Sequence, residues 1–135
     1  MTEAASTGPL KVLIAEDERD IRELVGFTLT FGGYQVVEVP NGAVAVEKAQ
    51  EELPDLIILD VRMPKMTGYE ACKKLKSMEK TKDIPVVFLS AKGQEQEVKQ
   101  GMEVGALAYI LKPFAPNDLL EQVSKILRST GAISE

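Results

Sequence analysis

The sequence predicts an α/β fold in which five parallel strands form one doubly wound sheet with five helices on its two faces. Short apolar runs alternate with stretches of helical periodicity five times along the chain, and the apolar runs are nearly continuous. Strands that are apolar on both faces belong to a sheet covered on both sides, as in parallel β-α units. Hydrophobic residues make up 44% of the 135 residues, which suffices for one folded domain.

The first half of the chain predicts two strand–helix units after a flexible tail at residues 1–9. The apolar run 10–15 predicts the first strand, and glycines 32–33 end the helix that follows. The expected apolar face of this helix consists of Ile21, Leu24, Val25, Thr28 and Phe31. Residues 34–39 predict a second, more polar strand at an edge of the sheet, and Asn41 is expected to cap a second helix. The inward face of that helix is predicted to be Ala43, Val46, Ala49 and Leu53.

The second half predicts three more units of the same kind. The run 55–60 is the most apolar strand, and the helix 66–78 follows it. Residues 86–90 predict the fourth strand, which is followed by a polar helix at about 94–103. The run 106–111 predicts the fifth strand. The clearest amphipathic helix comes last, with its apolar face at Leu119, Leu120, Val123, Ile126 and Leu127.

Composition excludes several classes of function. The formal net charge of −5, without any basic block, argues against nucleic acid as the main partner. There is no histidine and only one cysteine, Cys72, which excludes Ser-His and Cys-His dyads, histidine-ligated metals and an internal disulfide. The N-terminus has no signal-peptide pattern, and no apolar run is long enough for membrane insertion. These features together predict a cytoplasmic location.

Chemically useful side chains follow the strands at their carboxyl ends. Glu16 and Asp17 follow the first strand, Asp60 ends the third, Ser90 ends the fourth, and Lys112 follows the fifth. In open α/β sheets, ligands bind at the carboxyl ends of the strands, where the strand order reverses. With the order 2-1-3-4-5, that point lies between the first and third strands, which carry all three carboxylates.

This set of side chains is suited to handling a phosphoryl group. Each residue alone is better explained as a cap, a turn former or a surface charge. Three clustered carboxylates need a cation, and ligation by oxygen alone favours Mg²⁺, with Mn²⁺ as a substitute. Asp60 can attack phosphorus to form an aspartyl phosphate, while Lys112 and Ser90 contact the phosphoryl oxygens. The sequence shows no histidine or other base, so a phosphohistidine on a partner is the expected donor.

The sequence resembles the receiver domain of response regulators in two-component systems, with a chemotaxis-regulator-like organisation. Four stretches carry the resemblance: "LIAEDE", "LIILDVRMPKMTG", "VVFLSA" and "AYILKPF". The resemblance implies a flavodoxin-like fold and a receiver domain at residues 10–129, between tails at 1–9 and 130–135.

The resemblance also implies a role for each residue at the rim. Glu16, Asp17 and Asp60 would hold the metal together with the main-chain carbonyl of Arg62, and Asp60 would be the phosphoacceptor. Ser90 would be the switch hydroxyl, and Lys112 would sense the phosphate.

Other positions would assist these residues. Tyr109 would be the switch aromatic, and the small Ala91 would leave room for the phosphoryl group. The peptide bond between Lys112 and Pro113 would be cis. Arg62 and Lys92 occupy positions that tune the lifetime of the aspartyl phosphate. Because both are long cations that could cover the phosphoryl group, we predict a long-lived phosphorylated form. The alternatives are that both side chains point into solvent or pair with surface acids such as Glu95, and that a cation here stabilises transition-state charge and speeds the loss of the phosphoryl group.

Two positions depart from the family pattern. Thr67 stands where an aspartate is common, with little expected consequence for the chemistry. Ala115 replaces the usual capping residue before the last helix, which should weaken the start of that helix by about 1 kcal/mol.

The expected function is that of a stand-alone response regulator, since no output domain follows Glu135. A histidine kinase or a histidine phosphotransferase would supply the phosphoryl group. Phosphorylation would then change the surface of the fourth helix, fifth strand and fifth helix for contact with a downstream protein. A phosphorelay intermediate is the alternative within this class.

Two rivals come from other classes. An aspartate-nucleophile phosphatase usually carries a second aspartate two residues after the nucleophile, where this chain has Arg62. A flavin carrier of similar fold would need a hydroxyl-rich loop after the first strand, where the acidic "EDERD" would repel a phosphate. The expectation is therefore a signalling switch that catalyses only its own phosphorylation and dephosphorylation.

Overall fold

The sheet has the predicted five parallel strands in the predicted order, β2-β1-β3-β4-β5. The strands are β1 (Lys11–Ala15), β2 (Gln35–Val39), β3 (Leu56–Asp60), β4 (Val86–Ala91) and β5 (Ala108–Lys112). The computed structural model describes residues 9–63, 65–91, 99, 102–103, 105–112 and 115–132.

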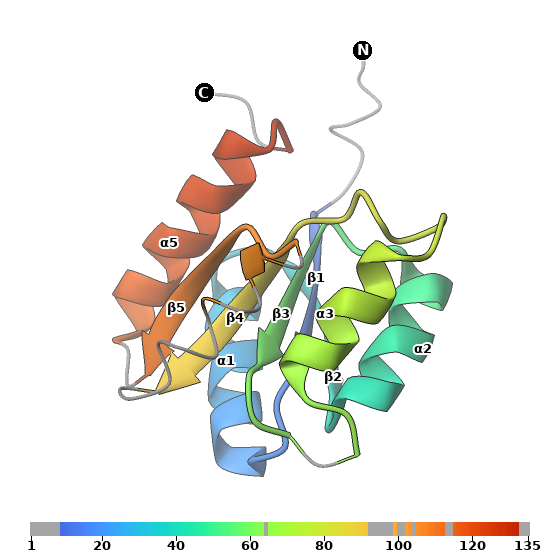
Figure 1. The fold of residues 1–135 in the computed structure, drawn as a ribbon. Coiled ribbons are helices and arrows are strands. Elements are labelled where there is room, and N and C mark those ends of the chain that lie inside the picture. The colour runs from blue at the N-terminus through green and yellow to red at the C-terminus, as the bar shows by residue number, and fades with distance from the viewer. Residues whose placement is uncertain are drawn as a thin grey trace.

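Helices cover both faces of this sheet, as Figure 1 shows. One face packs against α1 (Arg19–Phe31) and α5 (Pro116–Ser129), and the other against α2 (Gly42–Glu52) and α3 (Gly68–Lys76). The predicted helix at about 94–103 falls mostly outside the described residues. Among the helices that the structure describes, none is long and apolar enough to cross a membrane.

The central strand β3 explains why the apolar runs are continuous. Leu56 and Ile58 point into the layer of α1 and α5, while Ile57 and Leu59 point into the layer of α2 and α3. All four side chains are fully buried. The more polar β2 lies at an edge of the sheet and is only partly buried, as predicted.

The predicted apolar face of α1 is wrong in part. Val25 and Thr28 are buried as expected, but Leu29 completes the buried stripe. Leu24 and Phe31 were predicted to face inward but are exposed, and 80% of the Phe31 surface is accessible to solvent. At 100° per residue, Phe31 lies well round the helix from Val25, so one face cannot bury both against a flat sheet.

The inward face of α2 is also displaced from its predicted position. Val46 and Ala49 are buried as predicted, and Ala45 joins them in place of Ala43, which is exposed. Leu53 ends the helix in a left-handed conformation (φ 46°, ψ 61°) and is 52% exposed. The N-terminal cap was predicted correctly, because the Asn41 side chain accepts a hydrogen bond from the Val44 N–H.

Thr67, which differs from the aspartate common in the family, caps the N-terminus of α3. Its hydroxyl accepts a hydrogen bond from the Glu70 N–H, and the Glu70 carboxylate accepts one from the Thr67 N–H. This reciprocal pair is a capping box, and the spacing Thr-x-x-Glu in the sequence is its signal.

The last helix begins without a side-chain cap. Ala115 is the N-cap residue of α5, and its methyl group accepts no hydrogen bond. We expect Ala115→Ser to raise the free energy of unfolding by about 1 kcal/mol, because a serine hydroxyl satisfies one backbone N–H of the first turn. Urea unfolding of the two proteins measures this difference, with Ala115→Gly as the control for a change in backbone preference. Equal stability of Ala115→Ser and the parent would show that solvent already satisfies this helix end.

Candidate functional site

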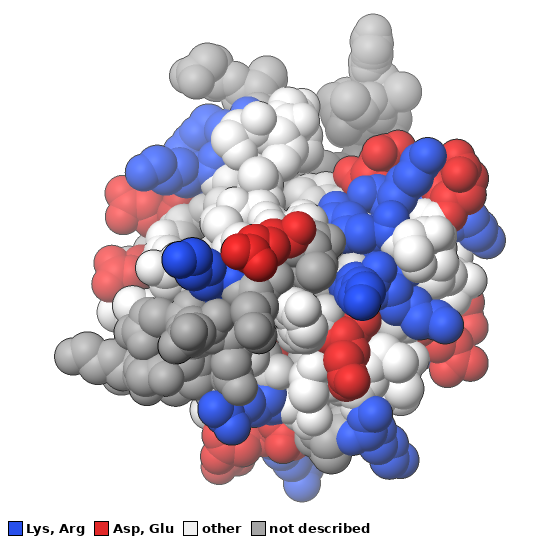
Figure 2. All heavy atoms as spheres, in the orientation of Figure 1, with Lys and Arg blue, Asp and Glu red and all other residues white. Residues whose placement is uncertain are grey.

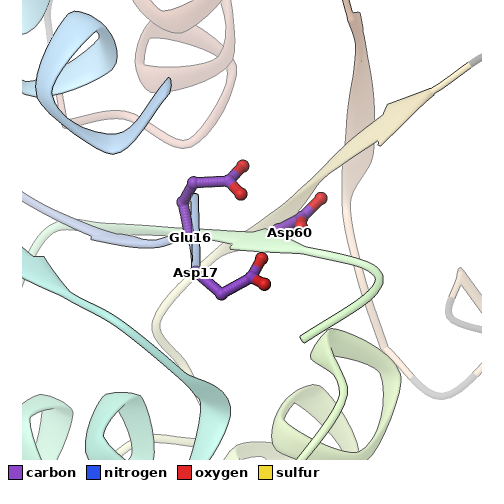
Figure 3. A group of neighbouring side chains, drawn as sticks. All are labelled: Glu16, Asp17 and Asp60. Atoms are coloured by element: carbon purple, nitrogen blue, oxygen red, sulfur yellow. The ribbon is translucent and has the colours of Figure 1, made fainter. Parts of the chain in front are cut away.

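Three carboxylates meet at the carboxyl ends of β1 and β3, as Figure 3 shows. The two strands are parallel neighbours, and Ala15 pairs with Leu59, so the residues that follow them lie side by side. One oxygen from each of Glu16, Asp17 and Asp60 lies within 4.8 Å of the others. Asp17 is exposed, whereas Glu16 and Asp60 are only 1% and 5% exposed.

Lys112 joins two of these carboxylates from the edge strand β5. Its ammonium lies 3.2 Å from the Glu16 carboxylate and 3.1 Å from that of Asp60. Ala91 pairs with Lys112 across β4 and β5, so the lysine lies two strands from Asp60 on β3 and three strands from Glu16 after β1. The sequence predicted these groups at one rim of the sheet. In the structure Lys112 forms ion pairs with both Glu16 and Asp60.

Burial and repulsion between carboxylates raise the pKa values of Glu16 and Asp60. Burial raises the pKa of Glu16 from 4.5 to about 7, and the Asp60 charge adds to the rise. Burial also raises the pKa of Asp60, although Lys112 opposes this. Burial alone would lower the pKa of Lys112, but Asp60 and Glu16 outweigh it and hold this pKa above its ordinary value. Because burial disfavours the ionised forms of these two acids, a cation bound beside them would stabilise those forms.

Several backbone contacts that the sequence did not predict position the acids. The Glu16 carboxylate accepts a hydrogen bond from the Glu18 N–H, and the Arg22 guanidinium donates to the Glu16 carbonyl. A Cβ at Gly68 would collide with the Asp60 carbonyl oxygen, so only glycine fits beside the end of β3. The signals were an arginine one turn into α1 and the glycine at the start of α3.

The remaining predicted site residues occupy different environments. Ser90 is fully buried in β4, one residue beyond the partner of Asp60. Tyr109 lies on the edge strand β5 and is 42% exposed. Arg62 is exposed just after β3. Lys92 and the proposed cis bond at Pro113 fall outside the described residues.

The donor set fits a hard divalent cation. All three side chains offer carboxylate oxygen, which Mg²⁺ prefers, and the open side at Asp17 leaves room for water or phosphoryl oxygens. Three clustered carboxylates and an ammonium thus stand at one rim of a doubly wound sheet. That arrangement is characteristic of domains that accept a phosphoryl group on aspartate.

Comparison with known families agrees with this assignment. Residues 12–124 match the model of the response regulator receiver domain. The chain belongs to this family, whose members generally bind Mg²⁺ and interact with a histidine kinase or a phosphotransfer partner.

Individual relatives share the fold and much of the sequence. The phosphate regulon transcriptional regulatory protein PhoB of Pseudomonas aeruginosa is 42% identical over 120 residues, which make up 89% of this chain and 52% of PhoB. The chain thus spans about half the length of the curated relatives it matches. The chemotaxis protein CheY4 of Vibrio cholerae superposes with a TM-score of 0.84 at 36% identity, covering 89% of this chain and 100% of CheY4. A putative response regulator from Chloroflexus aurantiacus gives 0.83 at 34% identity, covering 88% and 98% of the two chains.

Proposed function

We propose that this chain is a phosphorylation-activated switch that accepts a phosphoryl group on Asp60 from a phosphohistidine, in the cytoplasm. The observation that carries the proposal is the buried Asp60 carboxylate, 3.1 Å from the Lys112 ammonium and grouped with Glu16 and Asp17. The donor is a histidine kinase or a histidine phosphotransferase. The chain acts on its own aspartate and turns over no other substrate.

The transfer exchanges one bond to phosphorus for another. An Asp60 oxygen attacks the phosphorus, the phosphorus–nitrogen bond to the donor imidazole breaks, and the nitrogen keeps the electron pair. Glu16, Asp17, Asp60 and the Arg62 carbonyl would hold Mg²⁺, which when bound supplies charge neutralisation to the phosphoryl oxygens. Lys112 already reaches Asp60, so its ammonium can pair with a phosphoryl oxygen once Asp60 is modified.

The docking surface for the donor is proposed on α1, which begins three residues after Glu16. Leu24, Phe27 and Phe31 recur at helical spacing on its outer face, and Phe27 and Phe31 are 73% and 80% exposed. This exposed apolar stripe, on the helix whose first turn follows the acid cluster, suits the helical surface of a donor domain.

The output is proposed on the face formed by β5, α5 and the predicted helix at 94–103. Ser90 would move toward the phosphoryl group, and Tyr109 would turn from its exposed position into the space that Ser90 vacates. Ser90 and Tyr109 would each have two positions, and the charge of the phosphoryl group would shift the equilibrium between them. A downstream protein would recognise the phosphorylated state of this face.

Phosphotransfer profiling tests the proposal. The purified protein is mixed with phosphorylated histidine kinases of its own genome, with and without EDTA. We expect rapid transfer from one of them that requires Mg²⁺, with slower transfer to the variant Phe27→Ser/Phe31→Ser. Failure of every kinase and every small phosphodonor to label the protein would refute the phosphoacceptor assignment. Unchanged hydrogen exchange in residues 105–112 after phosphorylation would refute the proposed output face.

Arg62 provides a separate prediction about the lifetime of the phosphorylated form. We expect Arg62→Asn to speed the loss of the aspartyl phosphate about fivefold, the effect of about 1 kcal/mol, because the guanidinium no longer covers the phosphoryl group. Lys92→Glu should act in the same direction. The decay of phosphoprotein after removal of the donor measures the rate, with Lys125→Glu as the control. Unchanged or slower decay would show that these cations do not shield the group.

A further inference from the structure

A second surface, on the outer side of α3, carries an unbalanced positive charge. An open hollow of about 430 Å³ runs along this helix. Its lining residues are Lys65, Met66, Glu70, Lys73, Lys74 and Ser77. Three lysines thus stand with one carboxylate, although the chain as a whole carries a net charge of −5. Figure 2 shows lysine and arginine side chains gathered over the α3 side of the molecule.

The capping box explains why the single acid does not neutralise the lysines. Glu70 precedes Lys73 and Lys74 by three and four residues, which is the spacing for helical ion pairs. Its carboxylate instead turns back to Thr67, where it accepts hydrogen bonds from the N–H and the hydroxyl at 3.0 and 3.3 Å. Within the part of the chain that the structure describes, the three lysines of the hollow form no ion pair.

Local structure accounts for two of these lysines but not for the third. Lys73 and Lys74 lie in the last turn of α3, where a cation interacts favourably with the helix dipole. Lys65 lies before the first turn, where the dipole disfavours a cation. Its backbone is also left-handed, with φ 70°, a conformation that is unfavourable for a lysine. A ligand that needs cations at both ends of the hollow would explain its position.

We propose that this hollow binds a short acidic segment of a partner protein. Carboxylates of the segment would pair with Lys65, Lys73 and Lys74, and an apolar side chain would rest on the half-buried Met66. The nine residues of α3 span about 14 Å, the length of about four extended residues. A short segment is favoured over nucleic acid, because the net negative charge of the chain repels a long polyanion. This surface needs neither Mg²⁺ nor phosphorylation, so it stands apart from the proposed switch.

A labelled peptide tests the proposal without phosphotransfer. The probe is a fluorescein-labelled peptide of glutamates around a central leucine, and its fluorescence anisotropy is followed at physiological ionic strength without Mg²⁺. We expect Lys73→Glu/Lys74→Glu to weaken binding about tenfold, and Lys65→Glu to weaken it about threefold, as expected for exposed ion pairs. The matched control, Lys80→Glu/Lys125→Glu, makes the same change in net charge outside the hollow and should weaken binding by less than about twofold. A peptide with lysines in place of the glutamates should bind the double variant in the hollow more tightly than the parent.

Three outcomes would overturn the proposal. The first is no binding of the acidic peptide to the parent protein at millimolar concentration. The second is an equal loss of affinity in the hollow variant and the matched control, which would mean attraction by overall charge alone. The third is tighter binding of a double-stranded oligonucleotide that is lost in the same variants, which would assign the surface to nucleic acid. Thermal unfolding of each variant separates lost binding from lost structure.

Discussion

Replacement of Asp60 by asparagine is expected to abolish phosphorylation by acetyl phosphate in the presence of Mg²⁺. Asparagine has nearly the same shape as aspartate, so the site keeps its packing, but the carboxamide cannot act as the nucleophile. Asp60 is the acid that Lys112 contacts at 3.1 Å and lies at the switch point between β1 and β3. The parent protein should gain the mass of one phosphoryl group, and the variant should gain none.

Two controls make this result specific to the site. Asp118→Asn changes an exposed acid in the first turn of α5 and should leave phosphorylation unchanged. Asp17→Asn leaves the nucleophile in place but removes one candidate metal ligand, so it should raise the Mg²⁺ concentration needed for half-maximal labelling. Labelling of Asp60→Asn at a single site would mean that another residue accepts the phosphoryl group.

Replacement of Lys112 by methionine is expected to destabilise the metal-free protein in a way that depends on pH. The ammonium lies within 3.2 Å of both Glu16 and Asp60, and its loss leaves two nearly buried carboxylates without their cation. A buried charge that loses its partner destabilises a fold by about 3 kcal/mol or more. We expect this loss at pH 8 in EDTA, and added Mg²⁺ should restore much of the stability.

The direction of the pH dependence follows from the raised pKa of Glu16. Its folded pKa of about 7 exceeds its ordinary value of 4.5, so its protonated form adds stability fully below pH 4.5. That contribution is lost as the pH rises through 7. Without Lys112 both acids should hold their protons to a higher pH, so the variant should lie closer to the parent at pH 5 than at pH 8. Urea unfolding at the two pH values measures this, and Lys125→Met is the control. An equal loss of stability at pH 5 and pH 8 would contradict the assignment.

Much of the fold follows from short patterns in the sequence. Residues 56–59 are apolar at successive positions, which predicts a strand covered on both faces, and β3 is such a strand. The last helix shows its buried face directly, because Leu119, Val123 and Leu127 recur with helical spacing and have no competing stripe. The residues at the rim were also predictable. The strands that precede them can be recognised in the sequence, and the carboxyl ends of parallel strands lie at one edge of the sheet.

Other features depended on contacts that only the tertiary structure decides. The helix α1 has apolar residues on several sides. Only its packing against the sheet determines that Leu29 is buried while Phe31 faces solvent. The ion pairs of Lys112 with Glu16 and Asp60 join residues from three strands, so they depend on strand order and register.

The sequence by itself determined the strand–helix alternation and the types of chemical group at the rim, because these follow from local periodicity and residue identity. The tertiary structure decided which acids are buried, how far the pKa of Glu16 rises, and where the α3 lysines gather. These properties arise from distances and solvent exclusion between segments far apart in the chain. No local pattern in a sequence encodes such distances directly.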